Sequence, residues 1–136
     1  MSAQGSNKAA VRRYFDEVWV EGNIEYVSEL LTPGSLLADA VAANALTMRA
    51  AFSDIAVTID DLIAEEDKVA ARVTFTAIHS GPLFGFPPTG KSAVVSALYL
   101  FTFVDGRVRT MVCEAGTFEL LIALGLLPVP EASSGA

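Results

Sequence analysis

The run from Gly85 to Ser92 reads Gly-x-x-x-x-Gly-Lys-Ser, the letter pattern of a loop that binds nucleotide phosphates. Such a loop needs free backbone N–H groups and a helix that begins directly after the lysine. Pro87 and Pro88 each remove one such donor. The segment 93–101 that follows is rich in β-branched and aromatic residues, which predicts a strand. We therefore interpret the run as a loop between two long strands and expect no nucleotide binding.

Other reactive side chains are sparse. The chain has one histidine, His79, and one cysteine, Cys113, and no clustered carboxylates. This set offers no convincing metal site, so we expect no bound metal. A single cysteine cannot form an intramolecular disulfide, which fits a reducing, cytoplasmic location. We interpret Cys113 as a small buried apolar residue.

Composition excludes several classes of partner. The net charge of −7 gives nucleic acid no electrostatic attraction, so we expect no nucleic-acid partner. Residues 1–7 are polar and lack the basic-then-apolar order of a signal peptide. The 136 residues are 52% hydrophobic, yet no apolar stretch reaches the roughly 18 residues of a membrane span. We therefore expect no membrane partner, and the apolar excess should lie in the core, in a cavity or at an interface.

The order of elements predicts the fold class. Helical periodicity marks residues 8–21, which Asn7 can cap, and a short helix follows that ends at Thr32-Pro33-Gly34. Strand patterns and the hairpin signal Asp105-Gly106 fill the second half. Helices followed by long antiparallel strands predict an α+β fold, a curved antiparallel sheet with the N-terminal helices on its concave face. We expect one domain over 8–127, with disordered ends at 1–7 and 128–136. The remaining predicted elements are a strand at 36–39, a helix at 42–52, strands around 55–59, 72–77, 93–103 and 108–116, and a helix at 118–124.

Five phrases of the sequence occur in an order that points to a family. They are Leu30–Pro33, Ala51–Asp54, the loop that starts His79-Ser80-Gly81 and ends Pro88-Thr89-Gly90, Phe103–Gly106, and Leu120–Gly125. In this order the chain resembles the SnoaL-like polyketide cyclases of the nuclear-transport-factor-2-like cone fold, to which ketosteroid-isomerase-like proteins also belong. The resemblance implies an α+β barrel with an apolar central cavity, a hydrophobic ligand, no cofactor, and dimerisation through the sheet.

The chain departs from this family where acid/base chemistry is expected. The family's well-known members close rings by aldol chemistry, with an aspartate on the final strand as the acid/base. Counted back from Gly125, that aspartate falls near Gly116, and a histidine often found earlier on the strand falls at Met111. Polar family positions on the preceding strand fall at Tyr99 and Phe101. The usual proton carrier is therefore absent.

The remaining candidates for catalysis are two carboxylates and two tyrosines. Asp39 ends the predicted 36–39 strand, where ketosteroid-isomerase-like relatives carry a general base, although it can equally cap the helix that follows. Glu114 shares the strand face of Gly116 and can enter the cavity, or it is a surface carboxylate. Tyr14 and Tyr99 offer hydroxyl donors on apolar faces, where tyrosines are more often plain core. His79 is either structural or a ligand contact. The other expected cavity-lining residues are Phe15, Trp19, Met48, Phe52, Val73, Phe75, Phe101, Met111 and Gly116.

Three functions remain open at this stage. The first is a cofactor-free polyketide cyclase that holds a hydrophobic chain in reactive geometry, as in a cycloaddition. The second is an acid/base cyclase that uses Asp39 and Glu114 for epoxide opening, cyclic-ether formation or aldol closure. The third is a non-catalytic module that binds a hydrophobic ligand. In each case we expect a cytoplasmic homodimer whose other partner is a small apolar molecule.

Overall fold

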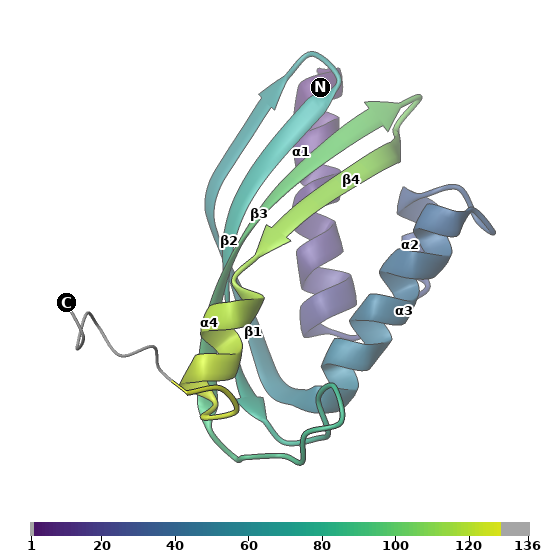
Figure 1. Ribbon diagram of the computed structural model, residues 1–136. Coiled ribbons are helices and arrows are strands. Elements are labelled where there is room, and N and C mark those ends of the chain that lie inside the picture. The colour runs from purple at the N-terminus through teal and green to yellow at the C-terminus, as the bar shows by residue number, and fades with distance from the viewer. Residues whose placement is uncertain (1, 129–136) are drawn as a thin grey trace.

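Four long strands form one antiparallel sheet in the order β1-β2-β3-β4 in the computed structural model, which describes residues 2–128 (Figure 1). The register pairs Tyr99 of β3 with Cys113 of β4. The predicted hairpin at Asp105-Gly106 is confirmed, with both residues at positive φ. The strands are β1 (Phe52–Glu65), β2 (Lys68–His79), β3 (Ser92–Val104) and β4 (Arg107–Ala115).

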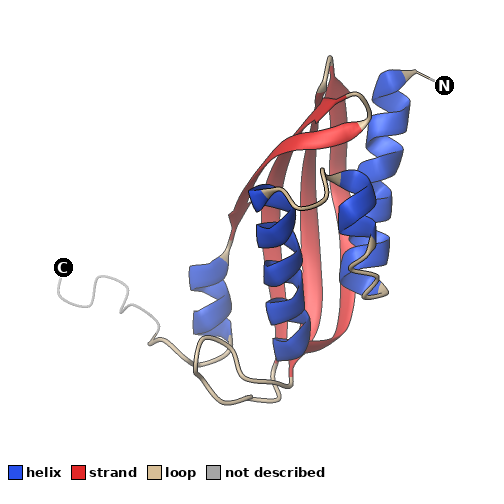
Figure 2. Ribbon diagram, turned by 90° about the vertical axis from the view of Figure 1, so that its right-hand side faces the viewer, coloured by secondary structure: helices blue, strands red, loops and turns tan. Residues whose placement is uncertain are grey.

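The helices leave one face of this sheet open. Figures 1 and 2 show α1, α2 and α3 against one face, which we call the inner face, and α4 beside one end of the sheet. The predicted α+β class and the curved sheet with helices on one side are confirmed. The helices are α1 (Ala3–Tyr14), the π-helix η1 (Phe15–Val20), α2 (Tyr26–Leu30), α3 (Leu36–Ala51) and α4 (Thr117–Ala123).

The first helix begins earlier than the sequence predicts. Ser2 is its N-cap, because the Ser2 hydroxyl accepts a hydrogen bond of 3.0 Å from the Gly5 N–H. The predictions of a disordered segment 1–7 and of a cap at Asn7 are therefore wrong, and Asn7 is buried within α1. The predicted tail beyond Pro128 lies outside the described residues.

The strand predicted at 36–39 is also wrong. The Ser35 hydroxyl accepts a hydrogen bond of 3.1 Å from the Ala38 N–H, so α3 already begins at Leu36. The alanines that follow favour helix, and the helical periodicity leaves Leu36 90% exposed. Asp39 consequently lies in the first turn of a helix.

Side chains from α1, η1 and the sheet fill one end of the inner face. Tyr14 and Phe15 pack edge-on at 5.1 Å between ring centroids, and Phe15 also meets Phe101 at 6.3 Å. Val69 and Val73 of β2 are fully buried in the same cluster. Residues at alternate positions of β2 and β3 point into this core, as a half-buried strand requires.

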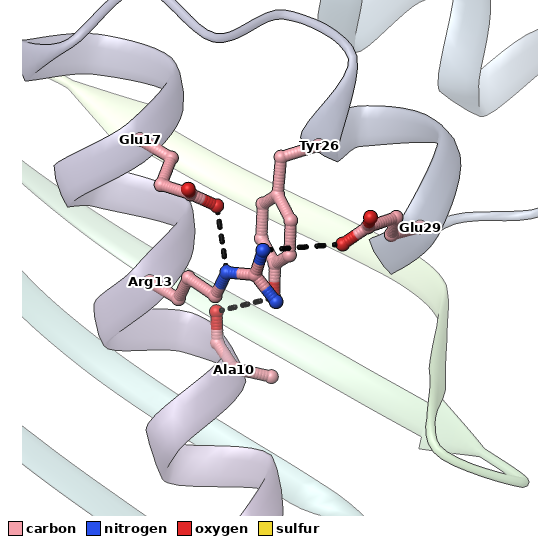
Figure 3. Close-up of polar contacts among 5 residues, drawn as sticks. All are labelled: Ala10, Arg13, Glu17, Tyr26 and Glu29. Carbon is pink, nitrogen blue, oxygen red and sulfur yellow. Dashed lines mark hydrogen bonds and ion pairs between the residues drawn. The ribbon is translucent and has the colours of Figure 1, made fainter.

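Arg13 joins α1 to α2 at the surface. Its guanidinium lies 4.3 Å from the centroid of the Tyr26 ring and forms ion pairs with Glu17 and Glu29 at 2.6 and 3.4 Å (Figure 3). The Tyr26 hydroxyl donates to the Ala10 carbonyl at 3.4 Å. These contacts fix the N-terminal helices against each other.

None of the helices within residues 2–128 is long and apolar enough to cross a bilayer.

Candidate active site

An apolar pocket of about 170 Å³ lies at the other end of the inner face. Its deep wall is formed by buried residues, among them Trp19, Phe52, Tyr99 and Leu120. It reaches the surface, since Asn44 on its rim is exposed. The expected apolar cavity is therefore present, and five of the predicted residues line it: Trp19, Met48, Phe52, Phe75 and Tyr99.

Small residues on the strands leave room for the pocket. Ala77 of β2 pairs with Ala93 of β3, and both line the pocket. Ala115, near the end of β4, adds a third alanine to the lining. At the filled end, inward Val73 and Phe101 pack together with Ala71 and Ala97, and helix side chains occupy the space above them. Well-packed interiors contain few voids, so short side chains under a fixed backbone create a cavity.

Tyr99 and Cys113 are polar groups on the pocket wall. They are cross-strand partners, and the Tyr99 hydroxyl donates a hydrogen bond toward the Cys113 sulfur. Burial raises the pKa of Tyr99 well above its ordinary value, and partial burial, on the side that faces the pocket, raises the pKa of the Cys113 thiol. Both groups are therefore neutral at physiological pH, and the hydroxyl is available as a donor. The prediction that Cys113 is a buried apolar residue is wrong, because its side chain is exposed.

The π-helix η1 positions Trp19 in the pocket. Its i→i+5 pattern is seen in the hydrogen bond from the Glu21 N–H to the Asp16 carbonyl, at 2.9 Å. Trp19 meets Phe75 at 5.2 Å between ring centroids, and its Nε1–H donates to the Tyr14 hydroxyl at 3.1 Å. Arg49 of α3 donates to the carbonyls of Trp19 and Val20, which holds the end of this π-helix.

Tyr14 lies behind the pocket wall. It is buried and is not among the residues that line the cavity. Burial raises the pKa of Tyr14 to about 12, an effect that the hydrogen bond from Trp19 partly offsets. Tyr14 is thus a neutral residue that supports Trp19.

The two predicted carboxylates do not meet in the pocket. Asp39 is exposed in the first turn of α3, where its carboxylate stabilises the N-terminus of the helix. It borders a second, separate pocket of about 260 Å³ between α2 and α3. Glu114 pairs with Leu98 on the outer face of the sheet, and both side chains are exposed. The acid/base alternative requires both to face one cavity, and neither lines it. Helix periodicity places Asp39 outside the pocket, and strand alternation places Glu114 outside it.

Several residues expected in the lining belong to other parts of the fold. Phe15, Val73 and Phe101 are fully buried in the filled end, and Met111 packs against that core. Gly116 follows β4 and donates its N–H to the Ser96 carbonyl at 3.0 Å, outside the pocket lining. An inward strand position thus does not tell whether a side chain meets a cavity or another side chain.

His79, the last residue of β2, has structural contacts with the loop between β2 and β3. Its ring is fully buried, lies 5.5 Å from the Phe52 ring, and accepts the Thr89 N–H at Nδ1 at 3.1 Å. The proton is therefore on Nε2, which has no hydrogen-bond partner among the described residues. His79 does not line the pocket.

Other lining residues were not predicted from the sequence. Asn44 and Thr117 supply polar groups at the rim, and Phe84 reaches the pocket from the loop between β2 and β3. Strand alternation could have indicated Val95, Cys113 and Ala115, which share the inward phase of Tyr99.

Within residues 2–128, no three His, Cys, Asp or Glu side chains gather closely enough to hold a metal ion.

The geometry above is that of a known family. The family profile described as SnoaL-like polyketide cyclase matches residues 9–112. This chain belongs to the SnoaL-like polyketide cyclase family. No curated protein sequence matches the chain significantly. Membership supports a cyclase role in general, at the level of the family.

Solved structures of similar proteins agree with this SnoaL-like fold. TsrD from Streptomyces laurentii is 24% identical with a TM-score of 0.82, covering 93% of this chain and 100% of its own. A proposed SnoaL-like polyketide cyclase from Jannaschia sp. CCS1 is 27% identical with a TM-score of 0.80, covering 94% of this chain and 98% of its own. AclR from Streptomyces galilaeus, a proposed hydroxylase, is 28% identical with a TM-score of 0.83, covering 95% of this chain and 87% of its own.

Proposed function

We propose that this SnoaL-like protein is a cofactor-free cyclase that closes a ring in a hydrophobic polyketide intermediate by holding the chain folded in its apolar pocket. One observation carries the proposal. No charged side chain is among the described residues that line the pocket, whereas its deep wall is aromatic and aliphatic. Such a site favours a large, neutral, apolar substrate.

Shape alone can supply much of the rate enhancement. Holding two reacting groups in near-attack geometry can remove on the order of 7–11 kcal/mol of barrier in the best cases. A cycloaddition exchanges π bonds for σ bonds within one molecule, so it needs no proton carrier. This chemistry fits a pocket whose lining lacks carboxylates and histidine among the residues described.

Tyr99 is the residue we assign to polarising the substrate. Its hydroxyl is held at the pocket wall, stays protonated because burial raises its pKa, and meets only a weak acceptor in the Cys113 sulfur. A carbonyl oxygen of the substrate is a stronger acceptor, so the hydroxyl would donate to it. Tyr14 acts through Trp19 and is a positioning residue.

The acid/base alternative has less support. Asp39 and Glu114 are both exposed and neither lines the pocket, so their environments give them no separate acid and base roles there. The binding-module alternative shares the pocket and differs only in the absence of turnover. Activity measurements therefore decide between it and the cyclase.

Filling the pocket tests the proposal. Ala77→Phe places a ring in the cavity, and Thr76→Phe adds the same ring at the adjacent position of β2, which is exposed on the opposite face. Neutral linear polyene ketones are incubated with each protein, and products of unchanged mass are identified by chromatography and NMR. We expect Ala77→Phe to lower the cyclisation rate at least about 100-fold and Thr76→Phe to retain it. Equal rates in both variants would overturn the proposal, and turnover by neither variant nor wild type would favour the binding module.

The outer face of the sheet supports a proposed homodimer. Five apolar side chains of β3 and β4 on this face are exposed, and a patch of this kind marks an interaction surface. Sedimentation equilibrium should give about twice the monomer mass of 14.3 kDa, and a monomer would contradict the proposal. The five residues are Val94, Leu98, Leu100, Val104 and Val112.

A further inference from the structure

The loop between β2 and β3 contains an unusual turn. Leu83 and Phe86 exchange two backbone hydrogen bonds, of 3.0 and 2.8 Å, around Phe84 and Gly85. Phe84 has φ of 49° and Gly85 has φ of 83°. Positive φ at both central residues is the type I′ pattern, which favours Asn, Asp or Gly at the first position. A phenylalanine there is strained, because its Cβ crowds the backbone.

The same chain offers a direct comparison. The turn between β3 and β4 has φ of 51° at Asp105 and 81° at Gly106, which matches the Phe84-Gly85 turn within a few degrees. There the first position carries aspartate, a residue that this conformation favours. The two turns thus share positive φ at both central positions, but only the second has a first residue that favours this conformation. A local misfit of this kind indicates a functional reason for the side chain.

Phe84 lies where such a reason exists. Its side chain lines the apolar pocket, although the residue is 61% exposed. An aromatic ring held half in solvent contributes little to folding, because little of its area leaves water. The ring therefore borders the pocket on one side and solvent on the other.

The rest of the loop is firmly held. The N–H groups of Ser80 and Gly81 both donate to the Ala51 carbonyl, at 3.0 and 2.9 Å. A Cβ at Gly81 would lie 2.1 Å from the Ala50 carbonyl oxygen, so only glycine permits this approach. Leu83 is fully buried, and Thr89 is tied to His79. The backbone of the turn is therefore fixed, and the Phe84 ring is presented to the pocket from a rigid base.

We propose that Phe84 is a ligand-contact residue that selects guests with a planar conjugated or aromatic group at the pocket mouth, at the cost of strain in its own turn. This inference rests on the proposed function, since it assumes that the pocket takes an apolar guest. A ring at the mouth and the Trp19, Phe75 and Tyr99 rings inside would contact such a guest from two sides.

Exchanging the residues of the two turns tests the inference. Phe84→Asn gives the first turn a favourable residue, and Asp105→Phe introduces the strained residue into the second turn, outside the pocket lining. Thermal melting measures stability, and the fluorescence of the neutral aromatic probe N-phenyl-1-naphthylamine measures binding. We expect Phe84→Asn to raise Tm by roughly 2–6 °C and to weaken probe binding about 5- to 30-fold. Asp105→Phe should lower Tm by a similar amount and leave probe binding unchanged.

Two further variants separate the possible failures. Phe84→Leu keeps an apolar side chain without the ring, and we expect it to weaken probe binding roughly 3-fold. Ala77→Phe should abolish binding, which shows that the probe occupies the pocket. If wild type binds the probe and Phe84→Asn binds it equally well, Phe84 is not a ligand contact and the inference fails alone. If Phe84→Leu binds as wild type does, the selection for conjugated guests fails. If wild type does not bind the probe in the pocket, the inference and the pocket on which the proposed function rests fail together.

Discussion

The two ends of the inner face of the sheet differ in how they are filled. At one end Tyr14, Phe15 and Phe101 pack ring against ring and are fully or almost fully buried. At the other end, alanines on β2, β3 and β4 face a cavity of about 170 Å³. The same four strands carry both ends, and the side chains of different helices meet them, α1 and η1 at the filled end and α3 at the pocket. One end of the inner face is thus packed, and the other contains the pocket in which we propose that a guest binds.

Truncating a ring should have its largest effect at the filled end. Phe101→Ala removes a fully buried ring from a packed cluster, and we expect the free energy of unfolding to fall by about 3–5 kcal/mol. Phe75→Ala on the pocket wall should lower it by roughly 1–3 kcal/mol, because this half-buried ring already borders a cavity. Urea unfolding measures both variants. Equal losses would show that the two ends are packed alike.

The second-largest effect is expected from alkaline pH, which should lower the free energy of unfolding through Tyr14 at the filled end. The pKa of Tyr14 is about 12 in the folded chain against 10.0 for a free side chain, so its protonated form is favoured by folding. Its contribution to stability is therefore intact below pH 10 and is lost as pH rises toward 12, by roughly 3 kcal/mol. Urea unfolding between pH 9 and 12 should show this decline, and Tyr14→Phe should reduce it. Tyrosinate absorbance at 295 nm from Tyr14 in the native protein near pH 10 would contradict the prediction.

The smallest effect is expected from polar groups at the open end. Tyr99→Phe removes the hydroxyl proposed to polarise the substrate, and we expect the cyclisation rate to fall about 3- to 10-fold, as for one neutral hydrogen bond. The control variants Asp39→Asn and Glu114→Gln should change it less than about 2-fold, because neither side chain lines the pocket. A loss of about 100-fold or more in either control would instead support proton transfer.

Periodicity predicted most of the elements because it depends on local sequence. Alternation in 93–103 and the Asp105-Gly106 turn predicted β3 and its hairpin to β4 within a residue or two. The prediction was wrong at Leu36–Asp39, where two leucines suggested a strand and the Ser35 cap starts a helix. It also missed the π-helix η1. This segment is only 6 residues long, so its wider turn leaves Val18 and Trp19 in an apolar pattern that an α-helix would also give.

The sequence by itself determined the order of helices and strands and the inward phase of Tyr99 and Phe101, because both depend on residues near one another in the chain. It also determined the membership of a family, because that depends on motifs in a fixed order. Only the tertiary structure decided which inward residues meet a cavity, that Asp39 and Glu114 lie outside it, and that Phe84 lies at its mouth. A cavity is the space left between segments distant in sequence. Its extent depends on the summed volumes of side chains that no local pattern compares.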